Sequence, residues 1–356
     1  MRSLRRKNAA NSVAVVAAGL CLGVALMPGR AAAEEVSTKD QLLELTGGYR
    51  VKVVWNQGAE NDKQLMFFDT DVGEVQALPV PGGSAPVISR DGRRVFVSAG
   101  KAPDERRVIM FDTETGDSKE FPAGPGNNLL EVWYDAEAGR EWVYVNSTGD
   151  FGEAWNQPRG GAIHRFPTDD PEARELFWNR TSSHIWLFLS ADGTRGCFEP
   201  SWGNIGQMKV AFTEDGQVDP GKSSYQQFGG GCFPSIAPDN SYRIFRLDGD
   251  HHSITMHDAD NSASRKIAVS DMPGVRENNR NTWLTRWSTH PRYLTLVAPA
   301  GGDAKIRIGR FDEEFTAVEQ WVQVSLPDGP QCWQSHAWVA TEMPAAERSG
   351  LFRRRR

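Results

Sequence analysis

The sequence predicts an all-β protein that folds as a single β-propeller, and three observations support the prediction. One pattern of short strands and tight turns recurs along most of the chain, with turns near residues 91, 135, 192, 239 and 289. These turns are 44 to 57 residues apart, and a repeat of about 40–50 residues with four short strands is typical of a propeller blade. The third observation is that the two ends of the chain each supply part of one further blade.

The clearest copy of the repeat covers residues 86–116. It contains the segments RRVFVS and RRVIMF, in which apolar and polar residues alternate as they do in half-buried strands. Asp91-Gly92 before the first segment is a tight-turn signal, and Asp112 to Gly116 forms a second turn. The same pattern recurs, less completely, at 131–147, 186–200, 233–260 and 283–299.

The sixth blade is predicted from the two ends of the chain. Residues 50–80 supply its second, third and fourth strands, while residues 331–339 read as a first strand with nothing after it. If the C-terminal strand completes the N-terminal blade, the ring closes and leaves no exposed sheet edge. We therefore expect six four-stranded blades over residues 48–340, with seven blades or another all-β arrangement as alternatives.

The repeat also resembles that of a known group of proteins. The segment SRDGRRVFV, and more loosely APDNSYRIF, is similar to the repeats of TolB-type six-bladed propellers, which are periplasmic or secreted. That broad group includes protein-interaction scaffolds, peptidase-associated propellers and polysaccharide lyases. The resemblance therefore implies architecture and leaves the function open.

The chain termini lie outside the repeats. Residues 1–33 combine a basic start, an apolar stretch and Ala31-Ala32-Ala33, which is the layout of a secretory signal peptide. We expect this segment to be cleaved and the mature protein to be secreted or periplasmic in a bacterial envelope; an uncleaved N-terminal anchor is the alternative. Residues 34–47 are predicted to be a linker, and residues 341–356, which end in Arg353 to Arg356, a basic disordered tail.

The composition bears on the class of partner. Residues 1–33 hold five basic and no acidic residues, so the mature chain carries 35 Lys and Arg against 46 Asp and Glu, a formal charge of −11. An acidic surface argues against nucleic acid as a partner, because phosphate binding needs a basic surface. No later stretch is long and apolar enough to span a bilayer, and we expect a monomer whose ligand is a protein, peptide or glycan.

Three cysteines remain after residue 33, and their spacing matches no metal-binding motif. In an oxidising compartment, one disulfide can form and one thiol is left over. Cys197 is predicted on the second strand of one blade, beside the start of the next blade, where Cys232 lies. We therefore expect a disulfide between Cys197 and Cys232 and a free Cys332.

Propeller geometry places the start of each first strand on the same side as the loop between the second and third strands. We call this side the loop face; the opposite side, with the turns between first and second strands, is the turn face. Loops converge on the axis at the loop face, so we expect ligands there. Counting back six positions from three turns gives Trp186, Phe233 and Trp283, and the shared pattern Cys-[Phe/Trp]-x-Ser adds Trp333. These four aromatic side chains either surround a ligand or fill the wedges between blades.

Polar residues suited to chemistry are predicted near the same face. His184 and His336 lie near the starts of their first strands, and Asp250 and His252 lie in a loop between second and third strands. Arg286 lies inside a first strand, where its guanidinium suits a carboxylate or sulfate ligand, or a salt bridge within the protein. Imidazoles and carboxylates can bind a divalent metal or transfer protons, but no two-histidine spacing here is diagnostic. We expect no resident cofactor, with a divalent metal as the alternative.

These observations favour a non-enzymatic binding module in the periplasm or cell envelope. The sequence lacks a G-x-S-x-G elbow, an H-E-x-x-H motif, a phosphate-binding loop and a dinucleotide-binding fingerprint. The alternative is a carbohydrate-active enzyme resembling a polysaccharide lyase, with a histidine and carboxylate site at the channel mouth. That alternative requires histidines from at least two blades to converge.

Overall fold

The structure, a computed structural model, divides into two compact units, Met1–Val36 and Ser37–Arg356, and all of its strands belong to the second. It describes residues 36–59, 62–81, 83–100, 106–121, 128–146, 161–182, 187–201, 204–214, 216–269, 272, 281–299 and 303–341. The predicted signal peptide therefore lies outside the described residues, and so does the predicted tail apart from Thr341.

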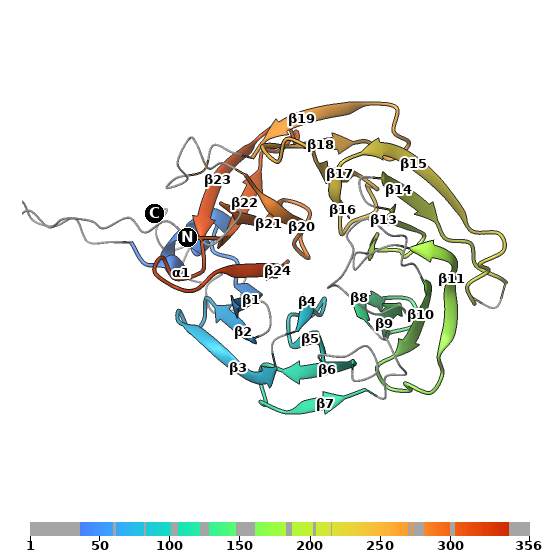
Figure 1. Cartoon of the computed structure of the whole chain (residues 1–356), viewed down its shortest axis with the longest axis horizontal. Coiled ribbons are helices and arrows are strands. Elements are labelled where there is room, and N and C mark those ends of the chain that lie inside the picture. Colours follow the sequence, from blue (N-terminus) through green and yellow to red (C-terminus); the bar gives the residue numbers. More distant parts are fainter. Residues whose placement is uncertain are drawn as a thin grey trace, which may run out of the picture. The chain divides into compact units, whose positions relative to one another are not determined.

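In the second unit, six antiparallel four-stranded sheets surround a common axis (Figure 1). Blade 1 holds β1 (Val51–Ala59), β2 (Asp62–Asp69), β3 (Val75–Pro81) and β24 (Cys332–Val339), and blade 2 holds β4 (Ser84–Ile88), β5 (Arg94–Ala99), β6 (Arg107–Asp112) and β7 (Ser118–Glu120). Blade 3 holds β8 (Asn128–Asp135), β9 (Arg140–Asn146), β10 (Gly161–Pro167) and β11 (Glu175–Ser182), and blade 4 holds β12 (Leu187–Leu189), β13 (Arg195–Ser201), β14 (Asn204–Lys209) and β15 (Ser224–Gly230). Blade 5 holds β16 (Cys232–Ile236), β17 (Ile244–Leu247), β18 (Ser253–His257) and β19 (Ser264–Ala268), and blade 6 holds β20 (Trp283–Trp287), β21 (Tyr293–Ala298), β22 (Lys305–Phe311) and β23 (Val318–Gln323). The predicted six-bladed propeller is confirmed.

The ring closes as the sequence predicts, through the C-terminal strand. β24 pairs antiparallel with β1, with Val54 opposite His336 and Trp55 opposite Ser335. β24 also contacts β4 of blade 2 and β20 of blade 6, so it is the inner strand of blade 1. The last strand of the chain thereby ties the first three strands into the ring.

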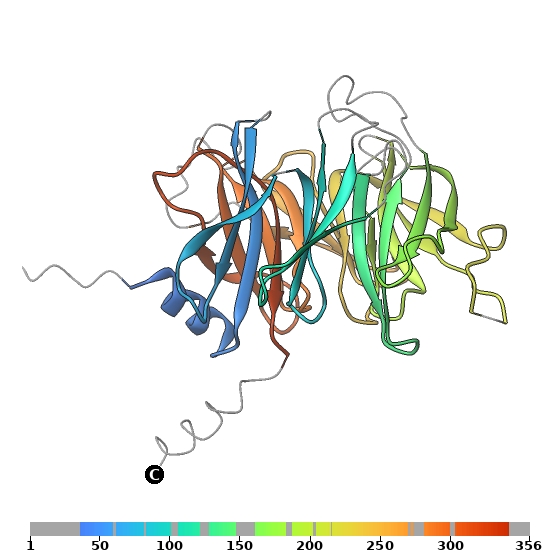
Figure 2. The same ribbon diagram turned by 90° about the horizontal axis from the view of Figure 1, so that it is seen from below.

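The two faces of the ring are separated in a side view (Figure 2). The turn between β8 and β9, at residues 135–140, lies at the lower side of that view on the turn face. The connection between β1 and β2 lies at the upper side, on the loop face. Many connections of the loop face, at 101–105, 122–127, 147–160 and 273–280 among others, lie outside the described residues.

The wedges between blades are filled by aromatic side chains. Between blades 5 and 6, the ring centroids of Phe245 and Trp287 are 4.6 Å apart, and those of Phe245 and Phe311 are 6.4 Å apart. Between blades 3 and 4, Trp178 packs edge-on against Phe198 at 5.7 Å. Burial of a large apolar side chain stabilises a fold by about 1.5–3 kcal/mol, so these contacts hold neighbouring blades together.

The Asp-Gly turns of the repeat are shaped by the preceding blade as well as by their own hydrogen bonds. In the first such turn, the Ser89 hydroxyl donates to Asp91 and accepts from the backbone N–H of Arg94. Gly92 adopts a positive φ of 72°, and a Cβ there would lie 2.5 Å from the ring of Trp338. Gly193, in the equivalent turn of blade 4, would meet Trp133 at 2.7 Å. The glycine is therefore needed for backbone conformation and for contact between blades.

The predicted linker at 34–47 contains a helix, so this expectation is corrected. Helix α1 (Thr38–Thr46) begins after Ser37, whose side chain accepts a hydrogen bond from the backbone N–H of Asp40, and ends at Gly47 with a φ of 70°. Leu42 and Leu45 are fully buried, and α1 contacts β23 and β1. Burial of these two leucines docks the segment onto the ring.

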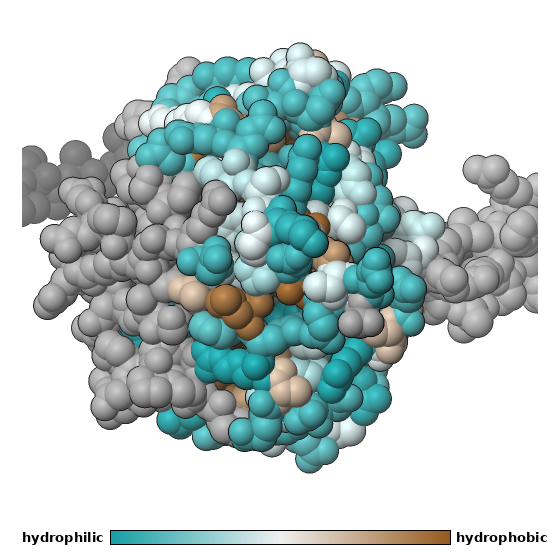
Figure 3. Space-filling view, turned by 90° about the vertical axis from the view of Figure 1, so that its right-hand side faces the viewer, coloured by the Kyte–Doolittle hydropathy of each residue, from teal (hydrophilic) through white to brown (hydrophobic). Residues whose placement is uncertain are grey.

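The outer surface on the side of β11 and β15 is mainly hydrophilic and carries one small apolar area (Figure 3). The exposed large hydrophobic residues among those described are Val36, Val72, Leu176, Phe212, Trp283 and Leu326. Within the part of the chain that the structure describes, no helix combines the length and apolar character needed to cross a bilayer.

Candidate functional site

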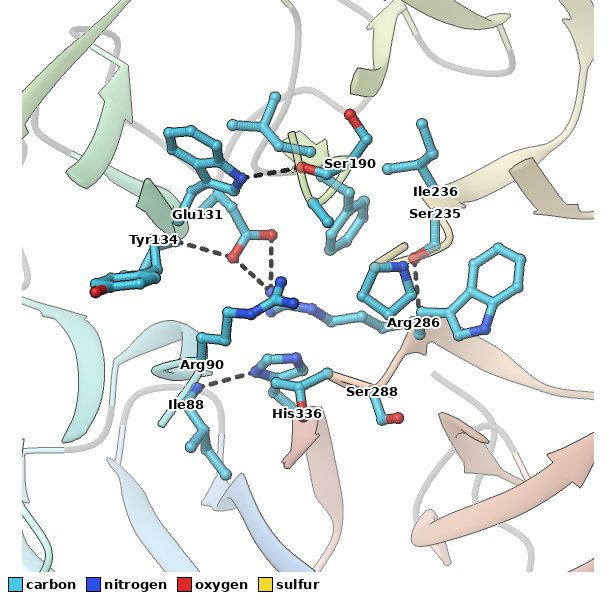
Figure 4. A pocket seen from close by; sticks show the side chains of 18 residues that line it. Ile88, Arg90, Glu131, Tyr134, Ser190, Ser235, Ile236, Arg286, Ser288 and His336 are labelled. Atoms are coloured by element: carbon cyan, nitrogen blue, oxygen red, sulfur yellow. Dashed lines mark hydrogen bonds and ion pairs between the residues drawn. The ribbon is translucent and has the colours of Figure 1, made fainter. Parts of the chain in front are cut away.

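A cavity of about 70 Å³ lies on the axis of the ring, and all six blades contribute to its lining (Figure 4). Its walls include Ile88, Phe188 and Ile236 from first strands, and its outer rim includes Arg90 and Thr289 from the turns that follow two of them. The cavity therefore opens toward the turn face. The sequence had placed the ligand side at the loop face, so the described cavity lies at the opposite end of the axis.

An ion pair crosses the axis at this cavity. Nη2 of Arg286 on β20 lies 3.0 Å from both carboxylate oxygens of Glu131 on β8. β20 and β8 belong to blades 6 and 3, which are three places apart in the ring and face each other. The guanidinium also lies 4.8 Å from the ring centroid of Phe188, and its Nη1 is 3.5 Å from the carbonyl oxygen of Pro86. One arginine thus contacts three other blades.

Both members of the pair are buried, with 4% of Arg286 and 8% of Glu131 exposed. Desolvation raises the pKa of Glu131 and is opposed by the positive charge of Arg286 and by hydrogen bonds. Desolvation lowers the pKa of Arg286 and is opposed by the charge of Glu131. Each residue therefore stays charged in the interior because the other carries the opposite charge. Removal of either one leaves a buried charge without a counter-charge.

His336 adds a neutral imidazole to the same cavity. Its Nδ1 accepts a hydrogen bond of 2.9 Å from the backbone N–H of Ile88, which places the proton on Nε2. Burial lowers the pKa of His336 well below its usual value, and the charge of Arg286 lowers it further. Among the described residues, no group accepts a hydrogen bond from Nε2. His336 is therefore an uncharged donor at the cavity wall.

Arg90 lies at the rim of the cavity with an exposed side chain. Its carbonyl oxygen accepts a hydrogen bond from Nε1 of Trp338, but its guanidinium has no ion-pair or hydrogen-bond partner among the described residues. Trp133 and Tyr134 line the rim from blade 3, and the indole N–H of Trp133 donates to the carbonyl oxygen of Ser190. The rim thus combines a free cation with aromatic rings (Figure 4).

The predicted polar residues are divided between two places. Arg286 and His336 meet at the cavity, where Arg286 takes the salt-bridge role. Asp250 and His252 lie on the exposed turn between β17 and β18, and His252 does not line the cavity that His336 lines. His184 lies outside the described residues, as does Trp186. The convergence of histidines that a lyase-like site requires is not present among the histidines described.

Asp250 has local partners that explain its position. It accepts a hydrogen bond from the backbone N–H of His252 and lies 2.9 Å from Nζ of Lys266. Partial burial on its own would raise the pKa of Asp250, but these hydrogen bonds, together with one from Ser253 and the charge of Lys266, bring it down to about 2. Asp250 is therefore engaged in a turn and an ion pair. No group of three or more His, Cys, Asp or Glu residues in the described ranges is arranged to hold a metal ion.

The predicted aromatic set does not share one level. Phe233 is buried with a positive φ of 49°, whereas Trp283 is 37% exposed. Trp287 at the end of β20 pairs with Leu294, and Ile236 at the end of β16 pairs with Ile244 in the same way. Trp283 lies four residues before Trp287, so it is level with Cys232, which lies four residues before Ile236. The turn after β16 is one residue longer than the turn after β20, and the sequence alignment missed that residue. The expected ring of aromatic side chains at one height is corrected accordingly.

Trp333 and Trp283 both keep part of their rings accessible. Trp333 is half-buried; its indole N–H donates to the carbonyl oxygen of Gly58, and Nζ of Lys63 lies 4.7 Å from its ring centroid. Trp283 contacts His251 edge-on, with ring centroids 6.2 Å apart. Their role in ligand binding stays a prediction.

The structure differs from the expected disulfide, because Cys197, Cys232 and Cys332 are all buried free thiols. The sulfur of Cys197 lies near Glu131 and the backbone N–H of Ile236, four residues along β16 from Cys232. A strand rises about 3.3 Å per residue, and a disulfide needs Cα atoms within about 7 Å. The two cysteines therefore lie at different heights between blades 4 and 5. Burial raises the pKa of Cys232 to about 11, with a contribution from Glu199.

Two charged residues of the cavity were not identified from the sequence, namely Glu131 and Arg90. Glu131 is the single acidic residue in the apolar start of its strand, NLLEVWY, just as Arg286 is the single basic residue in WLTRW. A charge in the inner strand of a propeller faces the axis or a neighbouring blade, so these two opposite charges were a usable signal. Arg90 carried no such signal, because it occupies an ordinary turn.

No protein-family model and no curated protein matches the sequence. Among solved structures, TolB from Acinetobacter baumannii is similar with a TM-score of 0.57 and 11% identity, over 84% of this chain and 70% of that chain. By fold, the chain is TolB-like. A chain of a nidogen–laminin complex gives 0.49 and 7%, over 81% and 98%, and virginiamycin B lyase from Staphylococcus aureus gives 0.41 and 15%, over 77% and 84%. These likenesses concern the fold and carry no function to this chain.

Proposed function

We propose that this protein is a non-enzymatic binding propeller, exported to the periplasm or cell envelope, which holds a protein, peptide or glycan. The observation that carries the proposal is the contrast between the interior of the axial cavity and its rim. Inside, Arg286 and Glu131 neutralise each other and His336 is fixed by Ile88. At the rim, the guanidinium of Arg90 has no ion-pair or hydrogen-bond partner among the described residues, and Tyr134 is half-buried. The arrangement suits recognition of a group that arrives from solvent.

The protonation states also favour binding over proton transfer. A general acid or base works best when its pKa lies near the ambient pH. The pKa of His336 is held well below that range, and Glu131 is committed to a buried ion pair. These groups supply a preorganised electrostatic environment. The lyase-like enzyme draws less support, because His252 does not line the cavity that His336 lines.

The loop face provides a second surface for the same function. Trp283 and Trp333 expose part of their rings there, and exposed indole faces suit sugar rings or apolar peptide side chains. Phe233 is buried, so its role in the proposal is to support the inner strand. Trp186 and His184, together with Asp250 and His252, remain candidates on the basis of the sequence. Export rests on the signal-like residues 1–33.

Ligand screening with the mature chain, residues 34–356, tests the proposal. We expect saturable binding to a member of a glycan array or an envelope-peptide panel, with the ligand recovered unchanged by mass spectrometry. Tyr134→Ala should weaken this binding, whereas Phe212→Ala should not, because Phe212 is exposed but does not line the cavity. Chemical conversion of the ligand, or no saturable binding to any member of the two panels, would contradict the proposal; binding indifferent to Tyr134 would assign the ligand to the loop face.

A further inference from the structure

We propose that the turn-face cavity is an anion subsite that receives a carboxylate group of the ligand. The inference rests on the proposed binding function and narrows it to one chemical class. Three features carry it: the charge of the lining, the surplus of hydrogen-bond donors and the small volume.

The lining has a surplus of positive charge. Its charged residues are Arg90, Arg286 and Glu131, and the last two form an ion pair. Arg90 is left as the uncompensated charge at the rim. This surplus stands out in a chain whose formal charge is −6. An anion entering from solvent would meet a guanidinium before any unpaired carboxylate of the lining.

The carboxylates of two adjoining turns have fixed partners within the protein. Asp91 accepts from the Ser89 hydroxyl and the Arg93 backbone N–H, and it pairs with Arg94. Asp192, in the equivalent turn of blade 4, accepts hydrogen bonds from the hydroxyls of Ser190 and Tyr242. These groups are occupied by the fold, so they reduce the attraction for an anion less than free carboxylates would.

The cavity offers donors but few free acceptors. Nε2 of His336 carries a proton and has no acceptor among the described residues, although only 5% of the residue is exposed. The Ser235 hydroxyl accepts from the backbone N–H of Trp287, and no described group accepts its own proton. The oxygens of Glu131 already accept from Arg286 and from the Val132 backbone N–H. A ligand rich in acceptors matches this lining, and a cationic ligand does not.

The volume sets the size of the group. About 70 Å³ is roughly half the ~150 Å³ of an engineered apolar cavity that holds one benzene molecule. A carboxylate with its adjoining carbon fits such a space, whereas a sugar ring or a folded segment does not. The rest of the ligand would therefore lie at the rim, beside Tyr134 and Thr289.

Two kinds of ligand carry the same group: a peptide with an acidic side chain or free C-terminus, and a glycan with a uronic acid. Calorimetric titrations of the mature chain should use acetate and neutral acetamide as minimal probes. A tripeptide with a free C-terminus against its amide, and glucuronate against its methyl ester, then distinguish the two sources. The variant is Arg90→Gln, and Arg93→Gln is its matched control, because Arg93 lies on the same turn, pairs with Asp112 and does not line the cavity.

We expect a carboxylate probe to bind wild type and Arg93→Gln equally, and Arg90→Gln to bind it roughly tenfold more weakly or worse, as a charged hydrogen bond is lost. The neutral partner of each pair should show no binding. Equal affinity for wild type and Arg90→Gln, equal affinity for a carboxylate and its neutral partner, or no binding of any carboxylate probe overturns the subsite. If the screen yields a ligand that binds regardless of Arg90, the subsite fails while the binding function stands.

Discussion

Arg286 and Glu131 face each other across the axis of the propeller, with Nη2 of the arginine 3.0 Å from both oxygens of the glutamate. They come from blades at opposite sides of the ring and are 155 residues apart in the sequence. The pair therefore links two blades on opposite sides of the ring, whereas β24 links neighbouring blades. It also closes the inner end of the cavity whose rim carries Arg90.

Glu131→Gln should lower the free energy of unfolding by about 3–5 kcal/mol, because it leaves the Arg286 charge buried without its counter-charge. Urea denaturation at constant pH measures the loss. The double variant Glu131→Leu with Arg286→Met should recover much of it, since no isolated charge remains. Asp169→Asn, which breaks the exposed pair with Arg140, is the control and should cause no measurable loss. Wild-type stability of Glu131→Gln would show that the pair does not hold the ring.

Glu141 should make stability fall as pH rises from about 4.5 to about 7. It is buried with Nη1 of Arg94 at 3.1 Å, and desolvation raises its pKa from 4.5 to about 7. Between these values the folded state holds a proton that the unfolded state has lost, so folding is favoured at the acidic end and the advantage disappears above pH 7. The free energy of unfolding of Glu141→Gln, taken as the difference from wild type, should therefore be up to about 3 kcal/mol higher at pH 8 than at pH 4.5.

Chemical denaturation across that pH range measures the Glu141 effect as a difference between variant and wild type. Glu120→Gln removes an exposed carboxylate on β7 and should leave the pH profile unchanged. A Glu141→Gln profile parallel to that of wild type would mean that folding leaves the pKa of Glu141 near its ordinary value.

The imidazole of His336 should stay neutral between pH 5 and pH 8. Burial and the charge of Arg286 hold its pKa well below the usual value, and Ile88 fixes the tautomer with the proton on Nε2. Nitrogen-15 chemical shifts of the ring should report that tautomer without a titration. A midpoint near the ordinary value of about 6.5 would indicate a solvated His336 and an open cavity.

Gly92→Ala should destabilise the fold more than Gly116→Ala. Both positions have a positive φ, 72° and 80°, so both substitutions carry a backbone cost of about 1–2 kcal/mol. A Cβ at Gly92 would also lie 2.5 Å from the Trp338 ring, whereas nothing lies within 4 Å at Gly116. Thermal unfolding of the two variants compares them. Equal losses would show that Trp338 yields readily and does not tie blade 1 to blade 2.

Much of the fold could be predicted because each blade repeats the same local rules. Alternating strands and Asp-Gly turns identified the blades, and the unpaired first strand at 331–339 predicted the closure. Helix α1 was missed although its signals were present: Ser37 as cap, Leu42 and Leu45 on one face, and Gly47 at the end. These signals were not used in the sequence analysis.

The site was harder to predict because it depends on heights and angles around a ring. One extra residue in the turn after β16 shifted the register and separated Phe233 from Trp283. The partnership of Glu131 with Arg286 follows only when blades 3 and 6 are known to face each other. Local sequence patterns predict where strands and turns lie. They do not predict how the blades are arranged around the axis, and this arrangement decides which inner side chains meet.

The most direct test of the binding role is chemical-shift mapping of a ligand from the screen on the mature protein labelled with nitrogen-15. We predict that the largest perturbations fall on the turn face, at the backbone signals of Arg90, Tyr134 and Thr289, and that the ligand is recovered unchanged. Perturbations confined to the loop face, at the indole signals of Trp283 and Trp333, or conversion of the ligand during the titration, would contradict a binding site at the axial cavity.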